Sequence, residues 1–117
     1  MITTRLMGRL GNQMFHYAAG RALAARVGTS LALAGRDVTR RGEGVLTRVF
    51  GLPVDPPGKL PPDRATSKLA YAAWRVLRTP PRLRREKGLG YNTDFSSWPD
   101  KTYLHGYWQS ERYFAEY

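Results

Sequence analysis

The chain has 117 residues and a net charge of +10, most of it from 15 arginines against 4 lysines. This length accommodates one domain, and a hydrophobic content of 42% is too high for a chain that is disordered throughout. Without cysteine, the chain cannot form disulfides, thiolate metal sites or a cysteine nucleophile. A surface this basic attracts anions such as nucleotides, nucleic acid and acidic lipid headgroups.

The sequence shows no targeting or membrane-spanning segment. No apolar run approaches the roughly 20 residues that cross a bilayer. Residues 1–5 lack the charged, apolar and cleavage regions of a signal peptide. Together with the absence of cysteine, these features predict a cytoplasmic protein.

The first third of the chain predicts a βαβ unit. The expected elements are a strand over 2–7, a tight loop over 8–11, a helix over 13–27 and a strand over 30–34. Asn12 is an acceptable N-cap for the helix, and Gly28 ends it as a C′ glycine. Because such a unit implies parallel strands, we expect an α/β fold with a Rossmann-like parallel sheet and flanking helices.

The rest of the chain has a mixed pattern. Residues 45–52 are too few to classify. The expected elements are a Pro-rich loop over 53–62, a helix from Asp63 to about Arg78, a loose basic segment over 82–90, a strand over 102–108 and a final helix from Glu111 that Ser110 caps. The helix that starts at Asp63 should bury an apolar stripe formed by Leu69, Ala70, Ala73, Trp74 and Leu77.

The segment Gly8-Arg9-Leu10-Gly11-Asn12-Gln13 stands between the first strand and the first helix. Its glycine spacing is not that of the dinucleotide fingerprint, and no Gly-Lys-Ser/Thr follows as in a Walker loop. Glycine permits positive φ and close approach of a ligand, and a helix N-terminus presents free N–H groups. The segment therefore indicates either a site for phosphates and sugar hydroxyls or a plain tight turn.

Two blocks resemble the α-1,2-fucosyltransferases, glycosyltransferase family 11. Residues 5–24 (RLMGRLGNQMFHYAAGRALA) resemble the opening of that family, and residues 104–114 (LHGYWQSERYF) resemble its later strand–helix segment. The blocks have the family's order and a comparable separation, while residues 36–102 match weakly. The resemblance implies that residues 1–117 are the incomplete N-terminal, acceptor-side domain of a two-domain GT-B-like glycosyltransferase. The C-terminal donor-binding domain, with its H-x-R-R-x-D motif, is absent.

The implied reaction transfers L-fucose from GDP-fucose, with inversion, to the 2-hydroxyl of a galactoside. The resemblance implies no metal and no further cofactor. A base must take the acceptor proton, and positive charge must hold the departing diphosphate. Because half of the cleft is missing, we expect this chain alone to be inactive or nearly so.

The resemblance also implies which residues bind substrate. They are Gly8, Arg9, Gly11, Asn12 and Gln13 in the loop, with Tyr107 and Trp108 as an acceptor-binding aromatic pair. A structural helix cap is the alternative for Asn12. Core packing is the alternative for at least one aromatic residue, because neighbouring strand residues face opposite sides. His16 and His105 are expected to be packed or surface histidines, and the sequence nominates no catalytic base.

From Arg64 to Lys87, eight basic residues stand against one acid, Glu86. This segment is a solvated face, a peripheral contact with the anionic inner face of the cell membrane, or a nucleic-acid-binding patch. Nucleic acid is the least favoured partner, because the chain lacks a helix-turn-helix, a zinc site and an RNA-binding aromatic motif. If this segment's only role is to bind an anionic partner, the chain is a non-enzymatic basic binding module rather than an enzyme fragment. A truncated gene product without activity is a further alternative.

Overall fold

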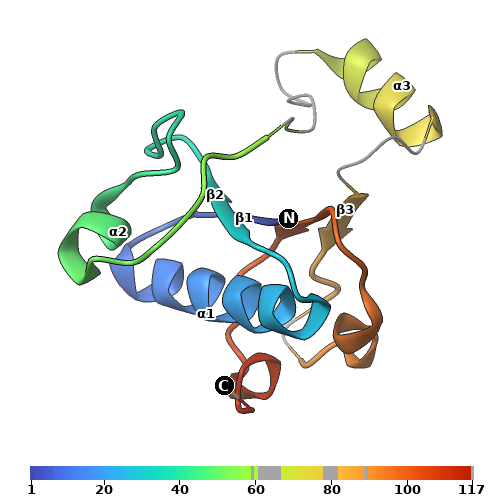
Figure 1. The fold of residues 1–117 in the computed structure, drawn as a ribbon. Coiled ribbons are helices and arrows are strands. Elements are labelled where there is room, and N and C mark those ends of the chain that lie inside the picture. Colours follow the sequence, from blue (N-terminus) through green and yellow to red (C-terminus); the bar gives the residue numbers. More distant parts are fainter. Residues whose placement is uncertain (59, 61–66, 78–81, 89, 117) are drawn as a thin grey trace.

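The structure is a computed structural model that describes residues 1–58, 60, 67–77, 82–88 and 90–116 (Figure 1). Its elements are β1 (Ile2–Arg5), α1 (Leu10–Val27), β2 (Leu31–Ala34), α2 (Val45–Phe50), α3 (Lys68–Leu77), β3 (Arg82–Arg85), η1 (Thr93–Ser97), β4 (Thr102–His105) and η2 (Glu111–Tyr113). The four strands form one sheet in the order β2-β1-β4-β3, and every pairing is parallel. The α/β class and the parallel sheet with flanking helices are confirmed.

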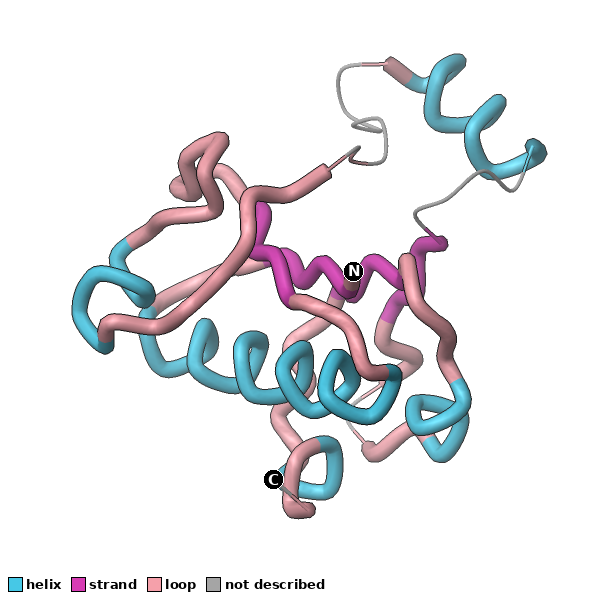
Figure 2. The backbone as a smooth tube through the Cα atoms, in the orientation of Figure 1, coloured by secondary structure: helices cyan, strands magenta, loops and turns pink. Residues whose placement is uncertain are grey.

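The β1-α1-β2 unit has the predicted parallel crossover. Gly28 ends α1 with φ 76°, and its N–H donates to the carbonyl oxygen of Ala24 at 2.9 Å. Gly20 lets α1 approach the sheet closely, because a Cβ there would lie 2.8 Å from Leu31 Cδ1 and 3.2 Å from Thr4 Cβ. In Figure 2, α1 runs along one face of the sheet.

The hydrophobic core fills the space between the sheet and α1. Parallel register places Ile2 beside Leu31, and Thr4 beside Leu33 and Leu104. Strand alternation then directs this row of side chains toward α1. The core is completed by aromatic rings from η1, η2 and the segment after β4, namely Phe95, Trp98, Trp108 and Tyr113.

Several predictions of element extent are wrong. The strands expected over 2–7 and 102–108 end at Arg5 and His105, so Tyr107 and Trp108 lie after the strand rather than in it. The helix begins at Leu10 rather than after Asn12, and its N-cap is Arg9, which makes no side-chain capping bond. Residues 82–90 are not uniformly loose, because 82–85 form the edge strand β3. Backbone pairing with β4 stabilises this strand, although its side chains show no buried pattern. The final helix is a three-residue 3₁₀ turn, η2, and the Ser110 hydroxyl accepts from the Arg112 N–H as expected.

The middle of the chain gives mixed outcomes. Residues 45–50, left unclassified by the sequence, form α2. The extended Pro-rich loop is confirmed over 53–58, where Asp55 bridges to β2. Asp63 and Arg78, the expected ends of the third helix, lie outside the described residues, as do 61–66 and 78–81.

The apolar stripe expected on α3 is only partly correct. Trp74 is buried together with Tyr71, whereas Leu69 and Leu77 are exposed. The helix therefore buries a face rotated from the one that its hydrophobic pattern indicates. Among the described residues, no helix is long and apolar enough to cross a membrane.

Candidate functional site

The β1–α1 loop has the glycine geometry that a tight strand-to-helix junction requires. Gly8 adopts φ 69°, and a Cβ at this position would lie 2.8 Å from Asn12 Nδ2. Gly11 lies within the first turn of α1, and a Cβ there would meet nothing within 4 Å. The backbone conformation therefore requires glycine at Gly8. Packing does not require glycine at Gly11, and the open space there lets a ligand approach the backbone.

The two amide side chains of the loop are held by internal hydrogen bonds. Gln13 Nε2 donates to the carbonyl oxygen of Gly8 at 3.1 Å. Asn12 Oδ1 accepts from Gln109 Nε2 at 2.7 Å, which ties the start of α1 to the segment after β4. Asn12 is not the N-cap of α1. Its side chain has a different structural role, because it links the residues that follow β1 to the residues that follow β4.

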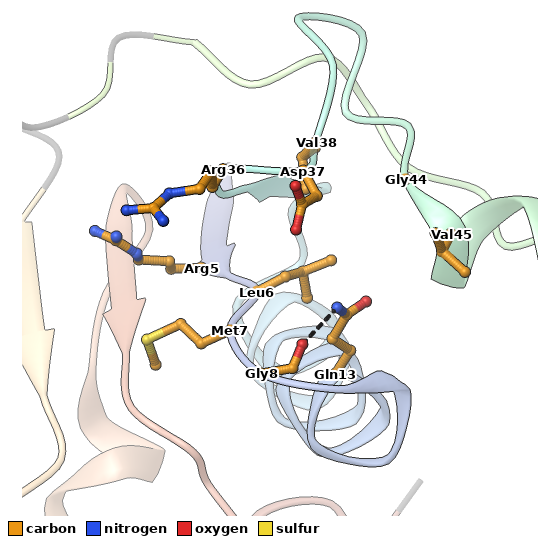
Figure 3. Close-up of a pocket in the computed structure, with 10 residues that line it drawn as sticks. All are labelled: Arg5, Leu6, Met7, Gly8, Gln13, Arg36, Asp37, Val38, Gly44 and Val45. Carbon is orange, nitrogen blue, oxygen red and sulfur yellow. Dashed lines mark hydrogen bonds between the residues drawn. The ribbon is translucent and has the colours of Figure 1, made fainter.

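A pocket of about 340 Å³ lies at the carboxyl ends of β1 and β2 (Figure 3). This is the sheet edge where ligands of open parallel sheets bind. Of the predicted binding residues, Gly8 and Gln13 line the pocket, and Arg9, Gly11 and Asn12 do not. The complete lining is Arg5, Leu6, Met7, Gly8, Gln13, Arg36, Asp37, Val38, Gly44 and Val45.

Sequence reasoning missed the charged residues of this pocket. Arg5 is the last residue of β1, and Arg36 and Asp37 follow β2 after Gly35. Figure 3 shows the two guanidinium groups extending to the same side, away from Gln13. The sequence did offer a signal for these residues. They lie at or just after the carboxyl ends of the two strands of the predicted βαβ unit, and parallel strands have their carboxyl ends at the same edge of the sheet.

The end of β4 adds a histidine to the same edge. Burial lowers the pKa of His105, and the positive charges of Arg5 and Arg85 lower it further. His105 is therefore neutral at pH 7. On the same strand, burial raises the pKa of Tyr103, although the neighbouring Arg5 opposes that change.

His16 is a packed histidine, fully buried in the first half of α1. Its Nδ1 accepts from the Met7 N–H at 3.3 Å, so the neutral ring carries its proton on Nε2. Among the described residues this Nε2 has no hydrogen-bond partner. Burial lowers the pKa of His16 to about 4, with a smaller contribution from the charge of His105.

The two aromatic residues after β4 have different environments. Tyr107 is exposed, with its ring centroid 5.7 Å from that of His16. Trp108 is fully buried against Trp98 and Tyr113, at centroid distances of 5.8 and 5.3 Å. We expected at least one of these two residues to pack in the core instead of binding a ligand. Trp108 is that residue, because its buried ring offers no surface to a ligand.

Glu86 holds the segment after β4 in place. Its two carboxylate oxygens accept from the Tyr107 N–H at 3.2 Å and the Trp108 N–H at 2.9 Å. Trp108 has φ 53°, which a non-glycine residue keeps only where its surroundings impose it. A Cβ on Gly106 would lie 2.5 Å from Glu86 Cβ, so this contact also requires glycine. The one acid of the basic segment is thus a structural clamp.

A second pocket, of about 520 Å³, lies where α3 meets β3. It is lined by five cationic side chains and one acidic side chain, together with Trp74, Leu83, Asn92 and Trp98. The charged residues are Arg75, Arg82, Arg84, Arg85, Lys87 and Asp94. In the described part of the chain, no group of three or more histidine, aspartate or glutamate side chains is placed to hold a metal ion.

Comparison of the chain with family models, with curated proteins and with solved structures gives no match.

Proposed function

We propose that this chain is the acceptor-side α/β half of a GDP-fucose-dependent α-1,2-fucosyltransferase of the GT-B-like kind. The whole enzyme would transfer L-fucose, with inversion, to the 2-hydroxyl of a galactoside. One observation carries the proposal. The loop that bears the family resemblance lies at the carboxyl edge of a parallel sheet and lines a pocket with Arg5 and Arg36.

In the proposal this pocket belongs to the acceptor-side wall of the cleft and contacts the nucleotide sugar from the side opposite the donor-binding domain. Two guanidinium groups can bind a diphosphate through paired hydrogen bonds, and their charge stabilises the diphosphate as it departs. The Asp37 carboxylate and the Gln13 carbonyl oxygen are acceptors for sugar hydroxyls. The same pocket thus contains cations for the diphosphate and hydrogen-bond acceptors for the sugar hydroxyls. A nucleotide sugar requires both kinds of group.

The proposed contacts differ from those that the motif alone indicates. Arg9, expected near the diphosphate, is exposed and does not line the pocket, and Arg5 and Arg36 replace it in the proposal. Tyr107 is the aromatic residue that we propose for the acceptor side, because its ring is exposed. In this proposal the 117-residue chain supplies only one side of the cleft, so we expect it to be inactive or nearly so by itself, because transfer requires donor and acceptor to be held together.

The test is a titration of the 117-residue chain with GDP-fucose, GDP and lactose, followed by amide chemical shifts. We expect GDP and GDP-fucose to shift the resonances of Gly8 and Gln13. Arg36→Gln should weaken that binding about tenfold, because it removes one cation from an exposed position in the pocket. Arg41→Gln is the matched control, since it removes an exposed cation outside the pocket lining.

Equal affinity of the two variants would remove the pocket from the proposal. Shifts confined to residues away from the β1–α1 loop would contradict the proposed site. Absence of binding by all three ligands would reject the glycosyltransferase assignment for this part of the molecule.

A further inference from the structure

Helix α3 is attached to the body of the molecule through one narrow face. The two residues that make this attachment, Tyr71 and Trp74, are the buried residues of the helix, and their ring centroids lie 5.8 Å apart. Arg85 Nη2 of β3 donates to the Tyr71 hydroxyl oxygen at 3.1 Å. In Figures 1 and 2, α3 stands away from the sheet and from α1.

Beyond this buried face, α3 has an apolar strip that is uncovered. Leu69, Val76 and Leu77 are 86%, 80% and 72% exposed. At 3.6 residues per turn, Leu69 and Val76 point away from Tyr71 and Trp74. Leu77 lies between these two positions and Trp74, so the three side chains form one exposed strip that borders the buried face. Large aliphatic side chains gathered on one exposed helix face mark an interaction surface rather than ordinary surface composition.

The surroundings of this apolar face are strongly positive. Lys68 and Arg75 lie on the polar side of α3 and are both exposed. The pocket between α3 and β3 adds four further cations, Arg82, Arg84, Arg85 and Lys87, to Arg75, against one carboxylate in its lining, Asp94. The nearby Glu86 carboxylate is already bound to two backbone N–H groups. The described part of α3 has no acidic residue.

We propose that α3 binds an anionic lipid surface. The helix would lie in the plane of the interface, with Leu69, Val76 and Leu77 in the acyl boundary. The flanking cations would then lie at the level of the phosphates. A helix with an apolar face and a Lys/Arg-rich polar face binds membranes in this way. This inference is independent of the proposed transfer reaction.

Charge complementarity favours lipid over other occupants. A nucleic acid would pair with the cations but would leave the three aliphatic side chains in water. A second copy of this chain would cover the apolar face but would bring a second net charge of +10 close to the first. An anionic lipid surface matches both features of α3. Its headgroup phosphates pair with the cations, and its acyl chains cover the aliphatic side chains.

The experiment is flotation of the chain with vesicles of phosphatidylcholine alone and of an equal mixture with phosphatidylserine. We expect binding to the mixed vesicles only. The double variant Leu69→Ser/Leu77→Ser should partition into them about tenfold less, because it removes apolar contact and leaves the charge unchanged. The matched control is Val49→Ser/Phe50→Ser on α2, which removes two side chains that are 60% and 49% exposed and should bind as the parent does.

Other outcomes would overturn the proposal. Equal partitioning of the α3 variant and the parent would show that the net charge alone adsorbs the chain. Loss of binding in the α2 variant as well would show a nonspecific apolar effect. Absence of binding to the mixed vesicles would refute the lipid proposal. Retention of RNA, or dimerisation, that the α3 variant abolishes would then assign the exposed strip to that other partner. Thermal melts of both variants should match the parent, because every substituted side chain is exposed.

Discussion

Replacement of Glu86 by alanine should loosen the segment after β4 and destabilise the whole fold. The carboxylate is the acceptor for two backbone N–H groups, those of Tyr107 and Trp108, and the second bond is the shorter and more buried. Hydrogen bonds to a charged acceptor contribute about 1.5–3 kcal/mol when buried and less when water can replace them. We therefore expect Glu86→Ala to lower the free energy of unfolding by about 2–3 kcal/mol.

The assay is equilibrium urea unfolding together with a thermal melt. For a chain of this size the expected loss corresponds to a fall in Tm of about 10 °C. Amide hydrogen exchange provides a local readout, because the Trp108 N–H should lose protection more than the amides of α1. Glu86→Gln should be intermediate, since the amide keeps one acceptor oxygen and turns a donor toward the second N–H.

The matched control is Glu43→Ala, which removes the same charge from an exposed loop. We expect this change to alter the free energy of unfolding by less than about 0.5 kcal/mol. If Glu43→Ala and Glu86→Ala have equal effects, the two bonds to the main chain contribute nothing beyond surface charge, and the clamp is refuted.

Four further changes test the packing of Gly106, Gly11, Trp108 and His16. Gly106→Ala should destabilise by about 1–3 kcal/mol in a urea titration, because its Cβ would lie 2.5 Å from the Cβ of Glu86. Gly11→Ala should instead be neutral or stabilising by up to about 1 kcal/mol, since its site is open and helical, and equal effects at the two glycines would contradict the contact geometry. Trp108→Ala should cost about 3–5 kcal/mol in the same titration, and a change under about 1 kcal/mol would show that this ring is not core. Because burial lowers the pKa of His16 to about 4 from 6.5, the unfolded chain binds more protons below pH 6.5. The stability that neutral His16 contributes is thus complete above that pH and falls by up to about 3 kcal/mol as the pH drops toward 4. His16→Gln should flatten this part of the stability profile between about pH 7 and pH 4, and an unchanged slope would assign the acid sensitivity to other groups.

Local signals in the sequence determined the first half of the fold. The alternation of residues 2–5, the helical spacing over α1 and the C-terminal glycine Gly28 are each properties of a few neighbouring residues. A parallel crossover then follows from chain connectivity alone. Ser110 belongs to the same class, because its hydroxyl caps η2 within two residues.

The candidate site was only partly visible in the sequence. The glycine loop was predicted, and Gly8 and Gln13 do line the pocket. Arg5 and Arg36 were not predicted, because they stand 31 positions apart and meet only where β1 and β2 end together. The predicted βαβ unit already implied that β1 and β2 end at one edge of the sheet. Which side chains near those ends line the pocket depends on tertiary packing, which no local pattern encodes.

Tertiary structure alone decided three other features. The basic residues of β3 form a strand because the backbone of β4 pairs with them, and backbone pairing is independent of side-chain pattern. Glu86 became a clamp because β3 and β4 are neighbours in the sheet. The face that α3 buries was set by Tyr71 and its bond from Arg85, fourteen positions away, rather than by the hydrophobic stripe. In each case the deciding contact joins residues distant in sequence, so its energy appears only once the chain has folded.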